Sequence, residues 1–200
     1  MQDTIKRILE KYPTARASTQ FAGKHEIYSL FEKLKEEVSS LDFVNGNQNL
    51  LVKVSYGKGR WAAIPWLAIL DNRVTISTQR GVYVVILFQS KGEGIYLKLA
   101  QGVTEIVKDS ATGLIAIEEL KKRANTIKAM NPKMPGSTLD AVFNDQVTQQ
   151  EVGKVVSLGD LYEASTIYSK HYQRDSIPSG ADFARDLSAL VSCYENIFRK

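Results

Sequence analysis

The stretch from Leu50 to Asp71, LLVKVSYGKGRWAAIPWLAILD, limits the fold of this chain more than any other part of the sequence. In its first half apolar residues occupy every second position, which is the periodicity of a β-strand. The pattern breaks at Gly57-Lys58-Gly59 and resumes as an almost continuous apolar run over residues 61–70. Because glycine tolerates backbone angles that other residues avoid, the break predicts a tight loop. We therefore expect two neighbouring strands joined by a loop that carries a cation.

The composition is that of an ordinary globular protein. The chain has 200 residues, of which 44% are hydrophobic and 24% charged, and this favours one domain spanning residues 1–200. Its longest apolar runs, such as residues 82–88, are too short to cross a membrane as a helix. The first residues, MQDTIKRILEKY, are amphipathic and do not resemble a signal peptide. We expect a cytoplasmic domain that does not contact membranes.

Apolar residues at helical spacing predict helices on both sides of a central β region. The predicted helices span residues 4–12, which Pro13 should end, 25–41, 114–130, 161–172 and 181–198. Between Leu50 and Ala100 the loops are too short for helical crossovers, so successive strands should pair antiparallel. The predicted fold is α+β, with a central, mostly antiparallel sheet of four to five strands flanked by N-terminal and C-terminal helices.

Positive charge is concentrated in the predicted sheet. The net charge of the chain is +4, and residues 50–102 contain seven basic and two acidic residues, so this segment carries +5 and the rest −1. Such a field attracts the phosphates of nucleic acids. The alternative explanation is that lysines keep a solvated sheet edge from aggregating. That alternative suits Lys91 and Lys98 better than Lys58, which lies between two glycines.

Motifs for catalysis are missing from the sequence. The Gly57-Lys58-Gly59 stretch lacks the Ser or Thr that follows the lysine of a phosphate-binding loop, and no helix is predicted to begin there. His25 and His171 have no second histidine or thiol at ligand spacing, so neither a metal nor another cofactor is expected. Glu119-Leu120-Lys121 has the letters of a nuclease site, but it falls in a predicted helix with both charges toward solvent. These absences favour a binding module over an enzyme.

Aromatic side chains close to the basic loop can form a site for a nucleobase. Trp66 follows this loop, and Tyr83 and Leu87 share one face of the strand at residues 82–88. A flat side chain can stack on a base that has left its duplex, and polar side chains can contact the edge of that base. The candidates for these polar contacts are Ser77, Thr78 and Gln79. Core packing of the aromatic residues and an ordinary polar loop are the alternatives.

Several segments of the chain, taken in order, resemble one known family. They are SYGKGRWAAIPWLAILD, STQRGVYVVILF, YLKLAQG, IYSKHY and IPSGADFARDLSALVSCYENIF. Together they resemble the MrcB-type N-terminal domain, which heads the McrB subunit of modified-cytosine-specific restriction systems and also occurs alone or fused to other nuclease modules. The resemblance covers most of the chain. It implies a DNA-recognition domain of a modification-dependent (type IV) phage-defence system, which binds duplex DNA carrying methylated cytosine and flips this base into a pocket on the sheet.

The resemblance also implies roles for individual residues. Trp66, Tyr83 and Leu87 would line the pocket, and Lys58 would lie where the family can insert a side chain into the duplex. The well-known McrB member has an aromatic residue at this position, whereas this chain has Lys58. A contact to phosphate or to a base edge therefore suits Lys58 better than insertion as a wedge. The basic residues expected to contact DNA are Lys58, Arg60 and Arg80. A GTP- or ATP-driven motor and a nuclease, fused or as subunits, are expected partners, since cleavage and GTP hydrolysis belong to other parts of McrB systems.

Two other functions are compatible with the sequence. The first is recognition of a different ligand, such as unmodified DNA, RNA or a protein partner in a nuclease system. The second is a nuclease that uses Glu119 or Asp71 as its acidic residue. The preferred cytosine modification does not follow from the resemblance, because the McrB branch differs from this sequence around residues 77–79.

Overall fold

The computed structural model describes residues 1–21, 25–130, 148–149 and 156–198. Within these ranges the central feature is a five-stranded antiparallel sheet in the order β1-β2-β3-β4-β7. Its strands are β1 (Leu50–Gly57), β2 (Trp61–Asp71), β3 (Val82–Phe88), β4 (Gly94–Gln101) and β7 (Thr166–Gln173). Two short strands, β5 (Thr148–Gln149) and β6 (Val156–Ser157), pair with each other and not with this sheet.

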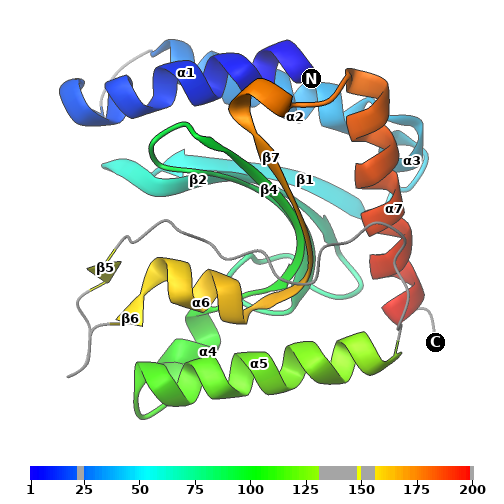
Figure 1. Cartoon of the computed structure of the whole chain (residues 1–200). Coiled ribbons are helices and arrows are strands. Elements are labelled where there is room, and N and C mark those ends of the chain that lie inside the picture. Colours follow the sequence, from blue (N-terminus) through cyan, green and yellow to red (C-terminus); the bar gives the residue numbers. More distant parts are fainter. Residues whose placement is uncertain (22–24, 131–147, 150–155, 199–200) are drawn as a thin grey trace.

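Helices lie on both sides of the curved sheet, as Figure 1 shows. On one face pack α1 (Gln2–Ser18), α2 (Glu26–Ser39) and α7 (Gly180–Phe198). On the other side lie α4 (Thr104–Asp109), α5 (Gly113–Met130) and α6 (Leu158–Ala164). Two short helices, α3 (Asp42–Asn45) and η1 (Arg174–Ser176), lie between α2 and β1 and between β7 and α7. The predicted α+β fold is confirmed. No helix in the described ranges is long and apolar enough to cross a membrane.

The central strand β3 is buried on both faces, which explains its continuous apolar sequence. Every second side chain, starting at Val82, packs into the larger core with α1, α2 and α7. The alternate side chains, starting at Tyr83, form a smaller cluster with residues of β2 and β4 and with Leu158 and Tyr162 of α6. This alternation agrees with the prediction, and the smaller cluster forms the walls of the candidate site.

The predicted hairpin is also present. β1 and β2 pair from Leu50 opposite Asp71 to Gly57 opposite Trp61. The loop between them contains two glycines with positive φ angles, 138° at Gly57 and 69° at Gly59, where a side chain would strain the backbone. The basic loop of the sequence analysis is therefore the connection at one end of β2.

Pro13 does not end the first helix, contrary to the prediction. Helix α1 continues through Pro13 to Ser18, although proline cannot donate the backbone hydrogen bond to the carbonyl of Leu9. Ala15, two residues beyond the proline, is 5% exposed, so its burial helps to stabilise the added turn. The backbone of Gly92 approaches the same place, since a Cβ atom there would lie 2.0 Å from the Leu9 carbonyl oxygen. Tertiary packing thus outweighs the local preference of proline.

The predicted helix over residues 161–172 is wrong beyond Ala164. Helix α6 ends at Ala164, and β7 pairs with β4, so that Tyr168 lies opposite Leu99 and Tyr172 opposite Ile95. The segment TIYSKHYQ is rich in the β-branched and aromatic residues that favour strands. Its partner strand lies about 70 residues earlier in the chain, so no local periodicity reveals the pairing.

Candidate functional site

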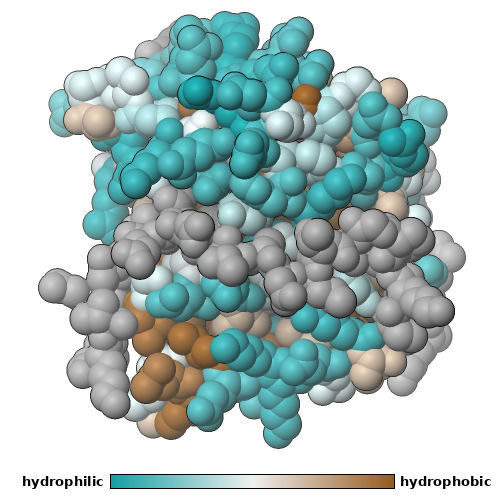
Figure 2. Space-filling view, in the orientation of Figure 1, coloured by the Kyte–Doolittle hydropathy of each residue, from teal (hydrophilic) through white to brown (hydrophobic). Residues whose placement is uncertain are grey.

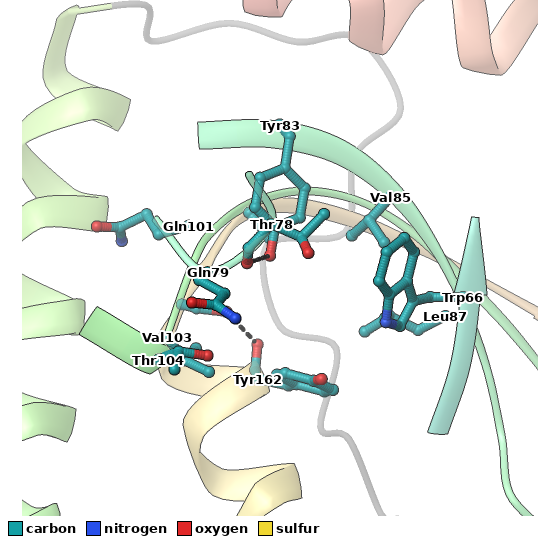
Figure 3. A pocket seen from close by; sticks show the side chains of 12 residues that line it. Trp66, Thr78, Gln79, Tyr83, Val85, Leu87, Gln101, Val103, Thr104 and Tyr162 are labelled. Carbon is teal, nitrogen blue, oxygen red and sulfur yellow. Dashed lines mark hydrogen bonds between the residues drawn. The ribbon is translucent and has the colours of Figure 1, made fainter. Parts of the chain in front are cut away.

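A cavity of about 140 Å³ opens on the sheet face that carries the smaller cluster. Its walls come from β2, β3 and β4, from the loop between β2 and β3, from the start of α4 and from α6. Five of the predicted site residues line it, namely Trp66, Thr78, Gln79, Tyr83 and Leu87 (Figure 3). The structure therefore brings the predicted aromatic and polar side chains together in one place.

The apolar wall of the cavity is built on paired strands. Trp66 of β2 lies directly opposite Leu87 of β3 in the antiparallel register. Leu87 is 4% exposed and Tyr83 is 8% exposed, so both belong mainly to the core. Trp66 is half-buried, and Figure 3 shows its indole beside Leu87 at one side of the cavity. Among the predicted aromatic residues, Trp66 is the one with a flat surface available to a ligand.

Helix α6 contributes Tyr162, a lining residue that the sequence analysis did not assign to the site. Burial raises the pKa of Tyr162 to about 12, so its hydroxyl is protonated at neutral pH. A local signal marks α6 as a separate short helix. Ser157 accepts a hydrogen bond from the Asp160 backbone, and the Asp160 carboxylate accepts one from the Ser157 backbone, which together form a capping box. This Ser-x-x-Asp pattern could have marked the start of α6, the helix that carries Tyr162.

The loop that carries Thr78 and Gln79 is held by hydrogen bonds from the sheet and from α4. The hydroxyl of Tyr83 donates to the Thr78 carbonyl oxygen at 2.9 Å, as the dashed line in Figure 3 shows. The backbone nitrogen of Glu105 donates to the Gln79 carbonyl oxygen at 3.1 Å. The backbone nitrogen of Gln79 donates to Ser77 Oγ at 3.2 Å. Ser77 therefore organises the loop and does not line the cavity, in contrast to Thr78 and Gln79.

A close approach of two backbone segments fixes the same loop against the end of β4. A Cβ atom added to Gly102 would lie 2.3 Å from the Arg80 nitrogen and 2.5 Å from the Gln79 carbonyl carbon, so only glycine fits without displacement. The Gly102 nitrogen donates a hydrogen bond to the Gly81 carbonyl oxygen at 2.8 Å. These contacts set the distance between the polar residues of the loop and the sheet.

The polar edge of the cavity is formed by two side chains of the loop between β2 and β3. Thr78 is half-buried and Gln79 is exposed, so both can contact a ligand. Two other polar lining residues already have partners, because Gln101 Nε2 donates to the Leu120 carbonyl oxygen at 3.0 Å and Ser165 Oγ donates to the Tyr162 carbonyl oxygen at 2.9 Å. A flat group with hydrogen-bonding atoms on one edge suits an aromatic wall facing such a polar edge.

The predicted basic residues lie outside the cavity. Lys58 and Arg60 are exposed on the hairpin loop before β2. Arg80 is 60% exposed in its side chain and forms an ion pair with Glu105 at 3.4 Å, next to the cavity loop. Arg80 therefore lies beside the cavity, whereas Lys58 and Arg60 lie on the loop at the other end of β2.

Lys98 is not a solvated edge lysine, contrary to one explanation of the charge pattern. It is 0% exposed and belongs to β4, which lies between β3 and β7. Its Nζ atom donates to Thr166 Oγ1 at 2.9 Å and lies 5.1 Å from the ring centre of Tyr96. Burial lowers the pKa of Lys98 to about 7, and the carboxylate of Glu163 opposes this shift. The amino group is therefore partly neutral at physiological pH.

The acidic residues considered for a nuclease are each engaged by an arginine. Asp71, with a side chain that is 3% exposed, binds Arg73 at 2.5 Å, and Glu119 binds Arg123 at 2.6 Å. In the part of the chain that the structure describes, no group of three or more His, Cys, Asp or Glu side chains could hold a metal ion. Whether the protein has catalytic activity stays a matter of prediction.

Together, the fold and the cavity define an α+β domain that can receive a flat group with a polar edge. The chain belongs to the family of MrcB-like N-terminal domains, because the sequence model described as "MrcB-like, N-terminal domain" matches residues 7–199. This match confirms the resemblance found in the sequence and connects the chain with McrB-like restriction systems. Comparison with curated proteins finds no match.

Proposed function

We propose that the protein binds duplex DNA carrying a modified cytosine and flips this base into the cavity beside Trp66. It would act as the specificity module of a modification-dependent restriction system. The observation that carries this proposal is the half-exposed indole of Trp66 facing a polar edge formed by Thr78 and Gln79, in a member of the MrcB-like family. A base taken out of a duplex is commonly held by stacking and by hydrogen bonds to its edge.

The burial of the lining residues supports different roles for them. Trp66 is accessible enough to stack on a base, whereas Tyr83 and Leu87 are almost fully buried and shape the cavity floor. Gln79 has both a donor and an acceptor on its side chain, so it suits the mixed hydrogen-bonding edge of cytosine. The choice among cytosine modifications would depend on how closely these walls approach the substituent on the ring.

The exposed cations at the two ends of β2 support contact with the DNA backbone. Lys58 and Arg60 lie at one end of β2, and Arg80 lies near the loop at its other end. A duplex whose extruded base enters the cavity would bring its phosphates toward these exposed groups, which neutralise charge without reading sequence. Double-stranded DNA is therefore the preferred partner over a protein. Cleavage would be performed by a nuclease partner with a GTP- or ATP-driven motor.

Base extrusion can be tested by fluorescence. 2-Aminopurine placed next to 5-methylcytosine in a short duplex becomes brighter when its neighbour unstacks, so titration with the protein should raise the signal on modified DNA. Because stacking on an aromatic residue is worth roughly 1–3 kcal/mol, Trp66→Ala should weaken binding by about one to two factors of ten. Trp66→Phe is the matched control, since it keeps a stacking surface. A tight complex of the wild-type protein with no rise in signal would reject base flipping.

Melting of each variant separates a binding role from a core role. Loss of a core tryptophan commonly destabilises a protein by about 3–5 kcal/mol, and a Trp66→Ala protein of that kind would be largely unfolded.

Equal affinity for unmodified duplex or for RNA would support a general nucleic-acid reader in place of a modification reader. Incubation with plasmid and magnesium tests the nuclease alternative. Cleavage by the wild-type protein that is lost in Glu119→Ala or Asp71→Ala would establish it.

A further inference from the structure

The loop that forms the polar edge of the cavity also presents an exposed isoleucine. Ile76 is 58% exposed, whereas its neighbour Thr75 is 6% exposed, and Thr78 two residues later lines the cavity. The other large hydrophobic side chains exposed in the described ranges are Leu114, Ile115 and Met130 of α5 and Phe198 of α7. Figure 2 shows apolar surface gathered over the start of α5, where Leu114 and Ile115 lie. Ile76 is thus set apart from that surface, because it belongs to the loop that carries Thr78 and Gln79.

Hydrogen bonds on both sides of Ile76 fix its backbone. The Nζ atom of Lys53 donates to the Ile76 carbonyl oxygen at 2.5 Å. Thr75 Oγ1 donates to the Ser77 carbonyl oxygen at 2.9 Å and accepts from the Ser77 nitrogen at 3.1 Å. The residues before and after Ile76 are therefore tied to each other, and the side chain between them points away from the core. Because the backbone at Ile76 is held before any ligand binds, little backbone entropy is lost when this side chain makes a contact.

The loop that carries Ile76 and the basic hairpin loop lie at opposite ends of β2. Trp66 lies near the middle of β2, with Lys58 in the loop before this strand and Ile76 in the loop after it. The two loops lie at opposite ends of the strand that carries Trp66, and DNA that delivers a base to Trp66 would extend toward both. The exposed charge of Lys58 suits a phosphate, whereas the aliphatic side chain of Ile76 suits the stacked interior of a duplex.

We propose that Ile76 is the wedge that enters the duplex and fills the space left by the extruded base, an inference that rests on the proposed function. Apolar side chains such as isoleucine insert between base steps in several DNA-bending proteins, where they offset unstacking energies of a few kcal/mol. Lys53 acts as a positioning residue, because its amine holds the carbonyl of Ile76.

A wedge has a specific energetic signature that a simple contact lacks. It stabilises the extruded state against the return of the base, so its contribution is largest when the target base is paired and smallest when the base is already unpaired. Two duplexes separate these cases: one with 5-methylcytosine opposite guanine, and one with 5-methylcytosine opposite an abasic site. Ile76→Ser should weaken binding to the paired duplex on the order of tenfold and to the abasic duplex by much less.

Controls are available within the chain. Ile76→Leu keeps an apolar side chain of the same size and should bind both duplexes as wild type does. Leu114→Ser removes a comparably exposed side chain from α5 and should leave both affinities unchanged. Trp66→Ala should weaken binding to both duplexes, because the base stacks in the cavity whether or not it was paired before binding. Melting of each variant confirms that it is folded, and Ile76→Ser should melt as wild type does because the side chain is largely exposed.

The outcomes distinguish this inference from the proposed function. If wild type raises the 2-aminopurine signal and Ile76→Ser binds the paired duplex equally well, Ile76 is not a wedge and base flipping stands. If Ile76→Ser weakens binding to both duplexes by the same factor, the side chain makes an ordinary contact and the wedge is rejected. If wild type raises no signal on either duplex, base flipping and the wedge both fail.

Discussion

The hydroxyl of Tyr83 donates a hydrogen bond to the backbone carbonyl of Thr78 at 2.9 Å, so the central strand holds the loop that forms the polar edge of the cavity. Burial raises the pKa of Tyr83, which keeps the hydroxyl protonated and able to donate. The ring belongs to the core while its polar end supports the loop. The residue therefore links the stability of the sheet to the geometry of the site.

Tyr83→Phe should separate these two roles, because it keeps the ring and removes the hydroxyl. One lost hydrogen bond should lower the free energy of unfolding by about 0.5–1.5 kcal/mol, measured by chemical denaturation. The loop should then hold Thr78 and Gln79 less firmly, so the affinity ratio between modified and unmodified duplex should fall. A variant that retains the wild-type ratio would show that the loop needs no support from Tyr83.

Gly102→Ala should displace the cavity loop. The added methyl group would lie 2.3 Å from the Arg80 nitrogen, and a backbone atom cannot move aside as a side chain can. We expect weaker binding to modified DNA and a lower melting temperature. Gly180→Ala is the matched control, because no atom lies within 4 Å of its added Cβ and the residue starts α7. Wild-type binding by Gly102→Ala would mean that the loop position is not important for recognition.

The exposed cations should determine the salt dependence of DNA binding. Lys58→Gln and Arg60→Gln should each reduce the slope of log affinity against log salt by about 0.9 if each side chain contacts one phosphate. Glu105→Gln should increase affinity, because it releases Arg80 from an ion pair. Lys33→Gln on the exposed surface of α2, which packs on the opposite sheet face, serves as the control. Unchanged slopes for the Lys58 and Arg60 variants would show that the hairpin loop does not touch the DNA backbone.

Lys98 should make the stability of the protein depend on pH. Its pKa is about 7 in the folded protein and about 10.4 in an unfolded chain, so between these values the unfolded state binds more protons. The free energy of unfolding should therefore rise as pH increases from 7 to 9, with a slope of at most about 1.4 kcal/mol per pH unit. Lys98→Met should remove this slope. Denaturation at several pH values measures it, and a slope that persists in the variant would assign it to another group.

The local sequence pattern determined much of the architecture. The apolar run of β3 and the helical stripe of α2 predict side chains that the structure buries. The two-residue period in β1 predicts the face that packs on the core, where Leu50 is buried and Val52 and Val54 are partly buried. The glycines around Lys58 likewise mark the hairpin loop without reference to any other part of the chain. These features were predictable because the chemistry that sets them lies within a few residues.

Tertiary structure decided the features that depend on distant partners. Strand β7 exists because residues 166–173 pair with β4, and α1 passes through Pro13 into a turn whose Ala15 packs in the larger core. Lys98 is enclosed because β4 is an interior strand, a property that its own sequence does not encode. The cavity is likewise a product of the fold, since Trp66, Thr78 and Tyr162 reach it from three separate elements. The sequence by itself determined the faces of the elements, and only long-range packing decided which faces meet, because the energies of burial and strand pairing depend on neighbours far along the chain.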